Sequence, residues 1–144
     1  MARSWGVKDE VPKLLVDAHL IYQNTMAVVD VCRKAGLEVF GVTKGVGGLP
    51  TVARAMLAGG VVGIADSRLA NLERLRSSGI GAPLMLLRSP TMGEISRVVA
   101  LVDILLCSSL PTINALSKAA IKQRREVQAI LMVAMGDRRE GIMP

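Results

Sequence analysis

One lysine, Lys44, follows directly after a short apolar segment, and its position suits covalent chemistry. The alternation of side chains predicts a strand over residues 38–44. Phe40, Val42 and Lys44 then share one face, so the lysine ends a strand that is otherwise apolar. Partial burial there would lower the pKa of the ammonium and leave a nucleophilic amine suited to a Schiff base. Spacing alone favours the simpler alternative, a lysine that reaches water from the end of a strand.

Polar residues also follow the other apolar runs of the chain, namely Asp66, Arg88, Ser108 and the segment 136–141. Catalytic residues of α/β folds lie at the carboxyl ends of strands, so these residues are candidates for a substrate pocket. An ion pair between Asp66 and Arg88 is one expectation, and it would be structural as readily as catalytic. Arg139 could bind an anionic oxygen in a bidentate manner, although its charge pattern alone favours a solvated arginine.

Other kinds of site are disfavoured by spacing and composition. The glycine-rich segment 45–48 fits no nucleotide motif, because Pro50 occupies the last glycine position of G-x-G-x-x-G and the lysine precedes the glycines instead of following them. His19 is the only histidine and the two cysteines form no CxxC pair, so we expect no metal site. The serines lack His and Asp partners in a triad pattern, which argues against a serine hydrolase.

The charge and hydropathy of the chain indicate which classes of partner it could bind. The chain carries 18 basic and 12 acidic residues, but the basic residues are scattered and only 2% of residues are aromatic. Without aromatic side chains for base stacking, a solvated basic surface is expected and nucleic acid is not. No apolar run is long enough to span a membrane, and the first ten residues are polar and charged. We therefore expect a cytoplasmic protein without a membrane partner.

The elements that position these residues are apolar strand-like runs that alternate with amphipathic segments of helical length. The expected strands cover residues 14–17, 39–43, 61–65, 84–87, 104–107 and 127–135. The intervening segments carry helix-start signals. These are N-caps at Asp17 and Ser67, Pro50 in a first turn, and a capping box from Thr91 to Glu94.

The strand ends recur at intervals of 20–22 residues, which is typical of βα units with parallel strands. Two architectures use such units. An open doubly wound sheet could be complete at 144 residues. A closed (β/α)8 barrel typically needs ~250 residues, so five βα units and a lead-in strand at 14–17 would form a partial barrel.

Five segments of the chain resemble a known family. They are residues 14–20, 38–44, 62–72, 84–90 and 130–141. Together they are similar to the N-terminal part of the alanine-racemase-like family, which comprises pyridoxal-phosphate enzymes built on a (β/α)8 barrel. The pattern looks most like the ornithine-racemase type of amino-acid racemase. The resemblance covers residues 13–144, and its more specific parts are the lysine and the Gly-Asp-Arg-Arg-Glu-Gly loop.

The resemblance implies roles for two residues and a class of substrate. Lys44 would hold pyridoxal phosphate as a Schiff base and exchange the α-proton of an amino acid on one face. Arg139 would lie near the phenolic oxygen of the cofactor. Alanine racemases carry a tyrosine four residues after the lysine, where this chain has Gly48. This departure disfavours alanine as the substrate.

By the same resemblance, residues 1–144 form only the N-terminal part of the barrel. The base on the opposite face, the main phosphate-binding loops and the C-terminal β domain would lie beyond residue 144. Because a half barrel has bare strand edges, we expect either a missing C-terminal half or a homodimer, and an isolated chain without activity. Two other functions stay open: a pyridoxal-phosphate-binding homeostasis protein without racemase activity, and a cofactor-free α/β binding module.

Overall fold

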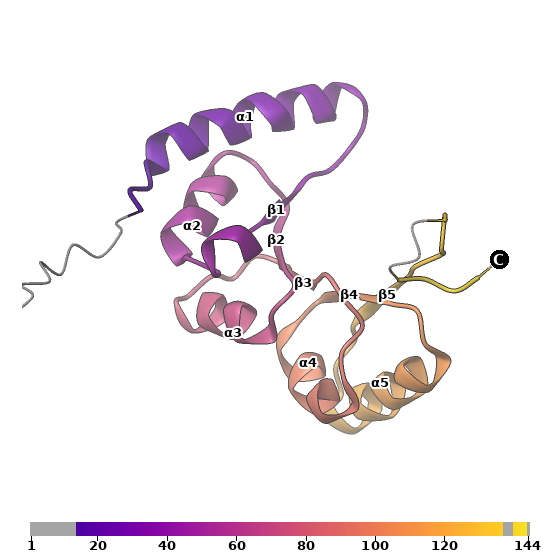
Figure 1. Cartoon of the computed structure of the whole chain (residues 1–144). Helices are drawn as coiled ribbons and strands as arrows, with labels where there is room; N and C mark the ends of the chain where they lie inside the picture. The colour runs from indigo at the N-terminus through magenta and orange to yellow at the C-terminus, as the bar shows by residue number, and fades with distance from the viewer. Residues whose placement is uncertain (1–13, 137–139, 144) are drawn as a thin grey trace, which may run out of the picture.

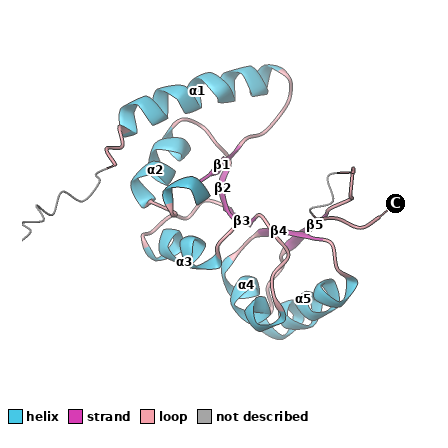
Figure 2. Ribbon diagram, in the orientation of Figure 1, coloured by secondary structure: helices cyan, strands magenta, loops and turns pink. Residues whose placement is uncertain are grey.

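The computed structural model describes residues 14–136 and 140–143, in which one helix precedes a series of alternating strands and helices (Figures 1 and 2). In chain order the elements are α1 (Ala18–Lys34), β1 (Phe40–Val42), the 3₁₀ turn η1 (Lys44–Val46), α2 (Pro50–Ala58), β2 (Gly63–Asp66), α3 (Leu69–Ser77), β3 (Leu84–Leu86), the 3₁₀ turn η2 (Met92–Glu94), α4 (Ile95–Leu101), β4 (Ile104–Cys107), α5 (Leu110–Gln123) and β5 (Gln128–Leu131).

The five strands form one parallel sheet in the order β1-β2-β3-β4-β5. Each strand therefore pairs with the next strand in sequence, whereas a doubly wound sheet reverses its order at a switch point. Figure 1 shows α2, α3, α4 and α5 on one side of the strands, with no helix on the other. This sequential, one-sided arrangement is that of a partial (β/α)8 barrel, and the doubly wound alternative is wrong.

The hydrophobic core lies between the sheet and the helices. Ile64, Leu84 and Leu105 on the strands are buried there with Leu72 and Val98 on the helices. The opposite face, which is the inner face of a barrel, is less covered: Val42 is 43% exposed and Ile130 is 46% exposed. The strands are apolar on both faces, as parallel sheets require, but the described residues cover only one of them.

Most helix-start signals are confirmed. Asp17 Oδ1 accepts hydrogen bonds from the amides of His19 and Leu20, and Pro50 begins α2. The capping box from Thr91 to Glu94 is present, although it opens η2 before α4. The cap at Ser67 is wrong, because Arg68 is the N-cap of α3 and the carboxylate of Asp66 accepts its amide proton.

The lead-in strand predicted over residues 14–17 is also wrong. These residues have no regular secondary structure, and Leu14 and Leu15 are 80% and 91% exposed. A strand needs a hydrogen-bonded neighbour, and the outer edge of β1 has no partner within the described residues. Residues 14–136 therefore form four strand–helix units followed by β5, instead of five units preceded by a strand.

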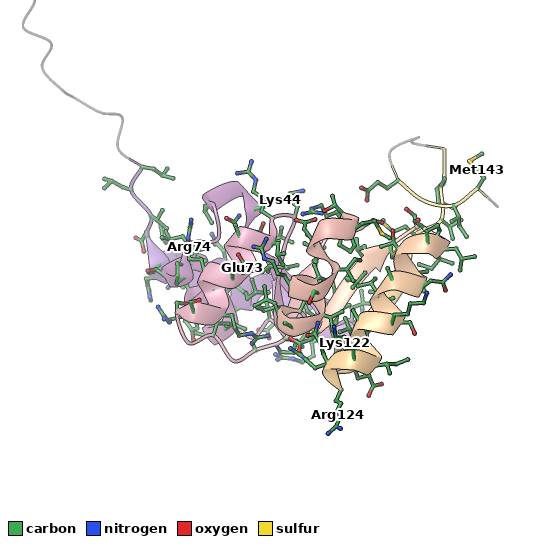
Figure 3. The ribbon with its side chains drawn as sticks, turned by 90° about the horizontal axis from the view of Figure 1, so that it is seen from below. Lys44, Glu73, Arg74, Lys122, Arg124 and Met143 are labelled. Atoms are coloured by element: carbon green, nitrogen blue, oxygen red, sulfur yellow. The ribbon has the colours of Figure 1, made fainter. Side chains whose placement is uncertain are left out.

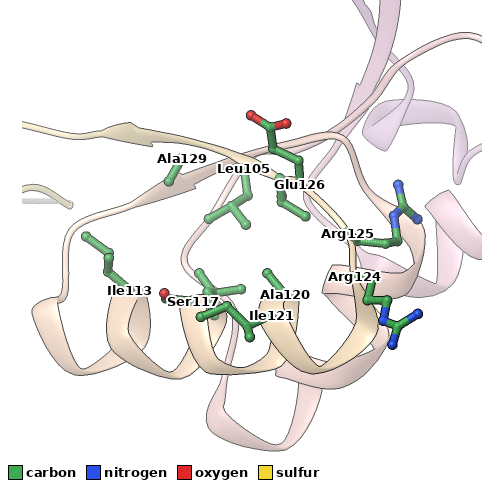
Figure 4. A pocket seen from close by; sticks show the side chains of 11 residues that line it. Leu105, Ile113, Ser117, Ala120, Ile121, Arg124, Arg125, Glu126 and Ala129 are labelled. Carbon is green, nitrogen blue, oxygen red and sulfur yellow. The ribbon is translucent and has the colours of Figure 1, made fainter.

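Two surface hollows flank the sheet. One of about 360 Å³ lies between α5 and β5, and its lining includes Leu105, Ile121 and Ala129 (Figure 4). Another of about 260 Å³ lies between α1 and β1, and its lining includes Val28 and Phe40. Both lie beside an outer strand of the sheet. Within residues 14–136 and 140–143, no helix has the length and hydropathy to cross a membrane.

Candidate functional site

Lys44 follows Thr43, the first residue after β1, and begins η1, so it lies at the carboxyl end of the sheet, as predicted. Figure 3 shows it at one edge of the molecule, with Arg124, the C-cap of α5, at the opposite edge. Lys44 is exposed, as in the simpler alternative of a lysine that reaches water, and the partial burial considered for covalent chemistry is not found. The reason is the uncovered inner face, on which Val42 is also exposed.

The backbone after Lys44 forms a closed turn. The carbonyl of Thr43 accepts the amide of Val46 at 3.0 Å and that of Gly48 at 3.1 Å. Gly47 and Gly48 have φ values of +62° and +66°, the left-handed region that favours glycine. A Cβ on Gly48 would lie 2.7 Å from the Cβ of Asn71, so any larger side chain would displace the start of α3. This contact explains in structural terms why a tyrosine does not fit at position 48.

The carboxylate of Asp66 lies beneath this turn and has no exposed surface. Thr43 Oγ1 donates to its Oδ2 at 2.9 Å, and Asn71 Nδ2 and the Arg68 amide donate to its Oδ1 at 3.1 Å and 2.9 Å. The expected ion pair with Arg88 is wrong, because neutral donors surround Asp66 and Arg88 binds elsewhere. Asp66 is turned toward the helices, so this geometry does not favour direct contact with a substrate.

Sequence reasoning missed Thr43 and Asn71. Alternation along the strand puts Thr43 on the face opposite Lys44. Its role as a donor depends on the register of β1 and β2, which pairs Val42 with Ala65 and so brings Thr43 beside Asp66. The only local signal was an amide side chain five residues after Asp66, which one turn of helix brings back to the strand end.

Arg88 anchors the segment that follows β3. Its Nη1 and Nη2 donate to both carboxylate oxygens of Glu94 at 2.9 and 2.7 Å, and its Nε donates to the carbonyl of Ser67 at 2.8 Å. These hydrogen bonds from Arg88, followed by those from Thr91, lower the pKa of Glu94 to about 2. The bond to Glu94 also raises the pKa of Arg88. Most of the guanidinium is therefore occupied by the chain itself.

The remaining predicted residues lie after β4 and β5. Ser108 is half-buried, and its amide donates to Ser89 Oγ at 3.2 Å, which links the carboxyl ends of β3 and β4. Arg139 lies outside the described residues. The neighbouring Glu140 is close enough to Arg88 for its negative charge to raise the pKa of that guanidinium. The loop after β5 therefore returns toward the same end of the sheet.

The chemistry available at this end is that of a primary amine. Lys44 presents an exposed Nζ, and among the described residues it forms no ion pair. The described chain holds no group of three His, Cys, Asp or Glu side chains that could bind a metal ion. An amine at the carboxyl end of a parallel sheet is suited to nucleophilic reaction with an aldehyde.

The sequence of the chain matches a known protein family. The model of the alanine racemase N-terminal domain matches residues 16–144. The chain belongs to this family. The chain is 33% identical over 131 residues to lysine racemase from Thermotoga maritima, and the match covers 91% of this chain and 37% of that protein. It is also 33% identical over 130 residues to ornithine racemase from Acetoanaerobium sticklandii, covering 90% of this chain and 36% of the relative. It thus spans little more than a third of these curated relatives.

Solved structures share the fold of this chain. D-threonine aldolase from Filomicrobium marinum superposes with a TM-score of 0.80 at 16% identity, covering 94% of this chain and 37% of that one. Alanine racemase from Streptomyces coelicolor A3(2) superposes with a TM-score of 0.78 at 19% identity, covering 90% and 35%. The family expected from the resemblance and the partial barrel are both confirmed.

Proposed function

We propose that this chain supplies the cofactor-binding lysine, Lys44, of a pyridoxal-phosphate-dependent amino-acid racemase. The observation that carries the proposal is an exposed amine on a closed turn at the carboxyl end of a parallel sheet, the end at which barrels of this type perform chemistry. The other described lysines, Lys34, Lys118 and Lys122, lie on the helices α1 and α5. Lys44 is therefore the described lysine whose position suits this role.

The described residues fit the carbonyl end of the cofactor. Lys44 offers an exposed Nζ, and the adjacent strand face carries the apolar Val42. When bound, pyridoxal phosphate withdraws electron density from the α-carbon of an amino acid and so makes its proton removable. The part of Lys44 is to bind the group and to carry the α-proton on its Nζ at one face. Arg139 is proposed to lie toward the cofactor.

Racemisation also needs a proton at the opposite face, and we propose that the base for that face comes from outside this chain. The chain alone is then inactive, and it requires either the remaining part of a longer protein or a second copy. We propose a basic amino acid as the substrate, because the relatives at 33% identity are lysine and ornithine racemases and Gly48 is incompatible with the alanine-racemase tyrosine. Ser108 and Arg88 are the proposed contributors to the substrate pocket, while the burial of Asp66 suits a different role.

The proposal is tested by titrating pyridoxal phosphate into the wild-type chain, Lys44→Ala and the matched control Lys122→Ala, with the visible absorbance as the readout. We expect a saturable change in the wild type and in Lys122→Ala, and at least tenfold weaker binding in Lys44→Ala. Circular dichroism checks that all three chains are folded. Identical curves for the three chains would instead indicate nonspecific reaction with surface amines and favour the cofactor-free binding module.

The alternative function, a pyridoxal-phosphate-binding homeostasis protein, would bind the same cofactor as the racemase but would not racemise amino acids. It is separated by following deuterium exchange at the α-carbon of lysine and ornithine with the complete protein. Exchange that is lost in Lys44→Ala supports the racemase. Cofactor binding without exchange would favour the homeostasis protein.

A further inference from the structure

We propose that Thr43, Asp66 and Asn71 are positioning residues that hold the Lys44 turn from the helix-facing side of the sheet. The inference rests on the proposed function of Lys44, but its structural part can be tested separately. It assigns Asp66 a role beneath the site instead of a role in the substrate pocket.

Thr43 and Lys44 are consecutive residues whose side chains lie on opposite faces of the sheet. Thr43 has no exposed surface and points toward the helices, whereas Lys44 is exposed on the other face. The amide of Thr43 donates to the carbonyl of Ala65 at 3.0 Å, which extends the pairing of β1 and β2 by one residue. Fixing Thr43 therefore fixes the backbone from which the lysine side chain extends.

Three neutral donors surround the Asp66 carboxylate. It is fully buried and accepts hydrogen bonds from Thr43, the Arg68 amide and Asn71, none of them charged. Burying a carboxylate without a cation is unfavourable, and an apolar side chain could fill the same space. What an apolar side chain could not do is connect the end of β1, the end of β2 and the start of α3.

The far end of the turn, at Gly47 and Gly48, is held by residues of α3. Asn71 packs directly against Gly48, and Arg74 Nη1 donates to the carbonyl of Gly47 at 2.6 Å. The Gly48 amide returns to the carbonyl of Thr43. The turn is thus held at its beginning by Asp66 of β2 and at its end by residues of α3.

The consequence is a lysine with a fixed backbone and a free side chain. A reacting amine gains from being confined to a small volume before its partner arrives, because less entropy is lost in the reaction. The buried cluster restrains the backbone without touching the reacting atoms. Thr43, Asp66 and Asn71 are accordingly positioning residues and not catalytic ones.

The structural part is tested by hydrogen exchange in Thr43→Val, which keeps the shape but loses the donor, and in Thr43→Ser, which keeps the donor. We expect exchange at the Val46 and Gly48 amides to rise at least tenfold in Thr43→Val and to return to near the wild-type rate in Thr43→Ser. The amide of Asp103, which bonds to Leu84 at the other end of the sheet, is the internal reference. Unchanged exchange at the turn, or an equal rise at Asp103, would overturn the proposal.

The functional part is tested by borohydride trapping of pyridoxal phosphate on the same chains, with peptide mapping of Lys44 relative to Lys122. The ratio of labelling should fall at least fivefold in Thr43→Val and recover in Thr43→Ser. If exchange responds but the ratio does not, the cluster has no positioning role toward the amine. If the wild-type chain shows no preference for Lys44, the proposed function fails, and the exchange result still decides whether the cluster holds the turn.

Discussion

The two ends of the sheet each hold a carboxylate, but in opposite ways. At the amino end, Asp103 accepts from Arg76 Nη2 at 2.9 Å, Arg125 Nη2 at 3.4 Å and the Leu84 amide at 2.9 Å. Its side chain is 37% exposed. At the carboxyl end, Asp66 is fully buried and has only neutral donors.

The surroundings of the two carboxylates extend this contrast. Arg76 also donates to the carbonyls of Ile80, Ala82 and Leu101, so the amino-end arginine joins several loops. The carboxyl end instead leaves the amine of Lys44 exposed above a buried, uncompensated carboxylate. The amino end is therefore held by partly exposed ionic hydrogen bonds, while the carboxyl end accepts an unfavourable burial of Asp66 in return for a defined geometry.

The largest effect is expected from Asp66→Leu. The substitution leaves the donors of Thr43, Asn71 and the Arg68 amide buried without an acceptor, so unfolding in urea should show a loss of about 3 kcal/mol. The matched change Asp103→Leu should cost only about 1 kcal/mol, because its arginines are partly exposed and can be hydrated. Equal losses at the two positions would remove the contrast between the ends.

A somewhat smaller effect is expected from Arg76→Ala at the amino end. It removes hydrogen bonds to three carbonyls and to Asp103, all partly exposed, and should destabilise the chain by about 2 kcal/mol in the same urea assay. Trapping of pyridoxal phosphate on Lys44 should not change while the chain remains folded. A parallel loss of Lys44 labelling in the folded variant would show that the two ends are not separable.

The Arg88–Glu94 pair gives the carboxyl end a pH-dependent contribution of about 1–2 kcal/mol. The pKa of Glu94 is lowered from 4.5 to about 2, so the folded state favours the charged carboxylate. Its stabilisation is fully present above pH 4.5 and is lost as the pH falls toward 2. The stability difference between the wild type and Glu94→Gln should follow that curve. A difference independent of pH would contradict the assignment.

The smallest effect is expected away from both ends. Arg33 and Asp30 form an exposed ion pair on α1, so Arg33→Ala should change the free energy of unfolding by less than about 0.5 kcal/mol. Thermal and urea unfolding of this variant provide the baseline for the other substitutions. A loss of unfolding free energy comparable to that of Arg76→Ala would mean that exposure does not explain why the substitutions differ in their effects.

The sequence predicted most of the fold, because its strongest signals are local or periodic. The apolar runs and the helix starts at Asp17, Pro50 and Thr91 fixed five strands and their intervening helices. The segment 14–17 was misread because its composition resembles a strand, whereas strand formation depends on a neighbour that a local pattern cannot supply.

The site was predicted in part. The position of Lys44 at a strand end follows from alternation alone, but its exposure depends on what covers the inner face. The hydrogen bond between Thr43 and Asp66 joins residues 23 positions apart, and only the register of two strands brings them together. The expected partner of Arg88 is wrong for a different reason, because Glu94 is presented by a local turn and not by a neighbouring strand.

Site-resolved trapping on the wild-type chain measures whether Lys44 is the cofactor-binding amine. Pyridoxal phosphate is added at increasing concentration, reduced with borohydride, and every lysine-containing peptide is quantified. Lys44 should be labelled at concentrations at which Lys34, Lys118 and Lys122 are still unmodified. Equal labelling of Lys44 and these three lysines at the same concentration would show that Lys44 is not the cofactor-binding amine.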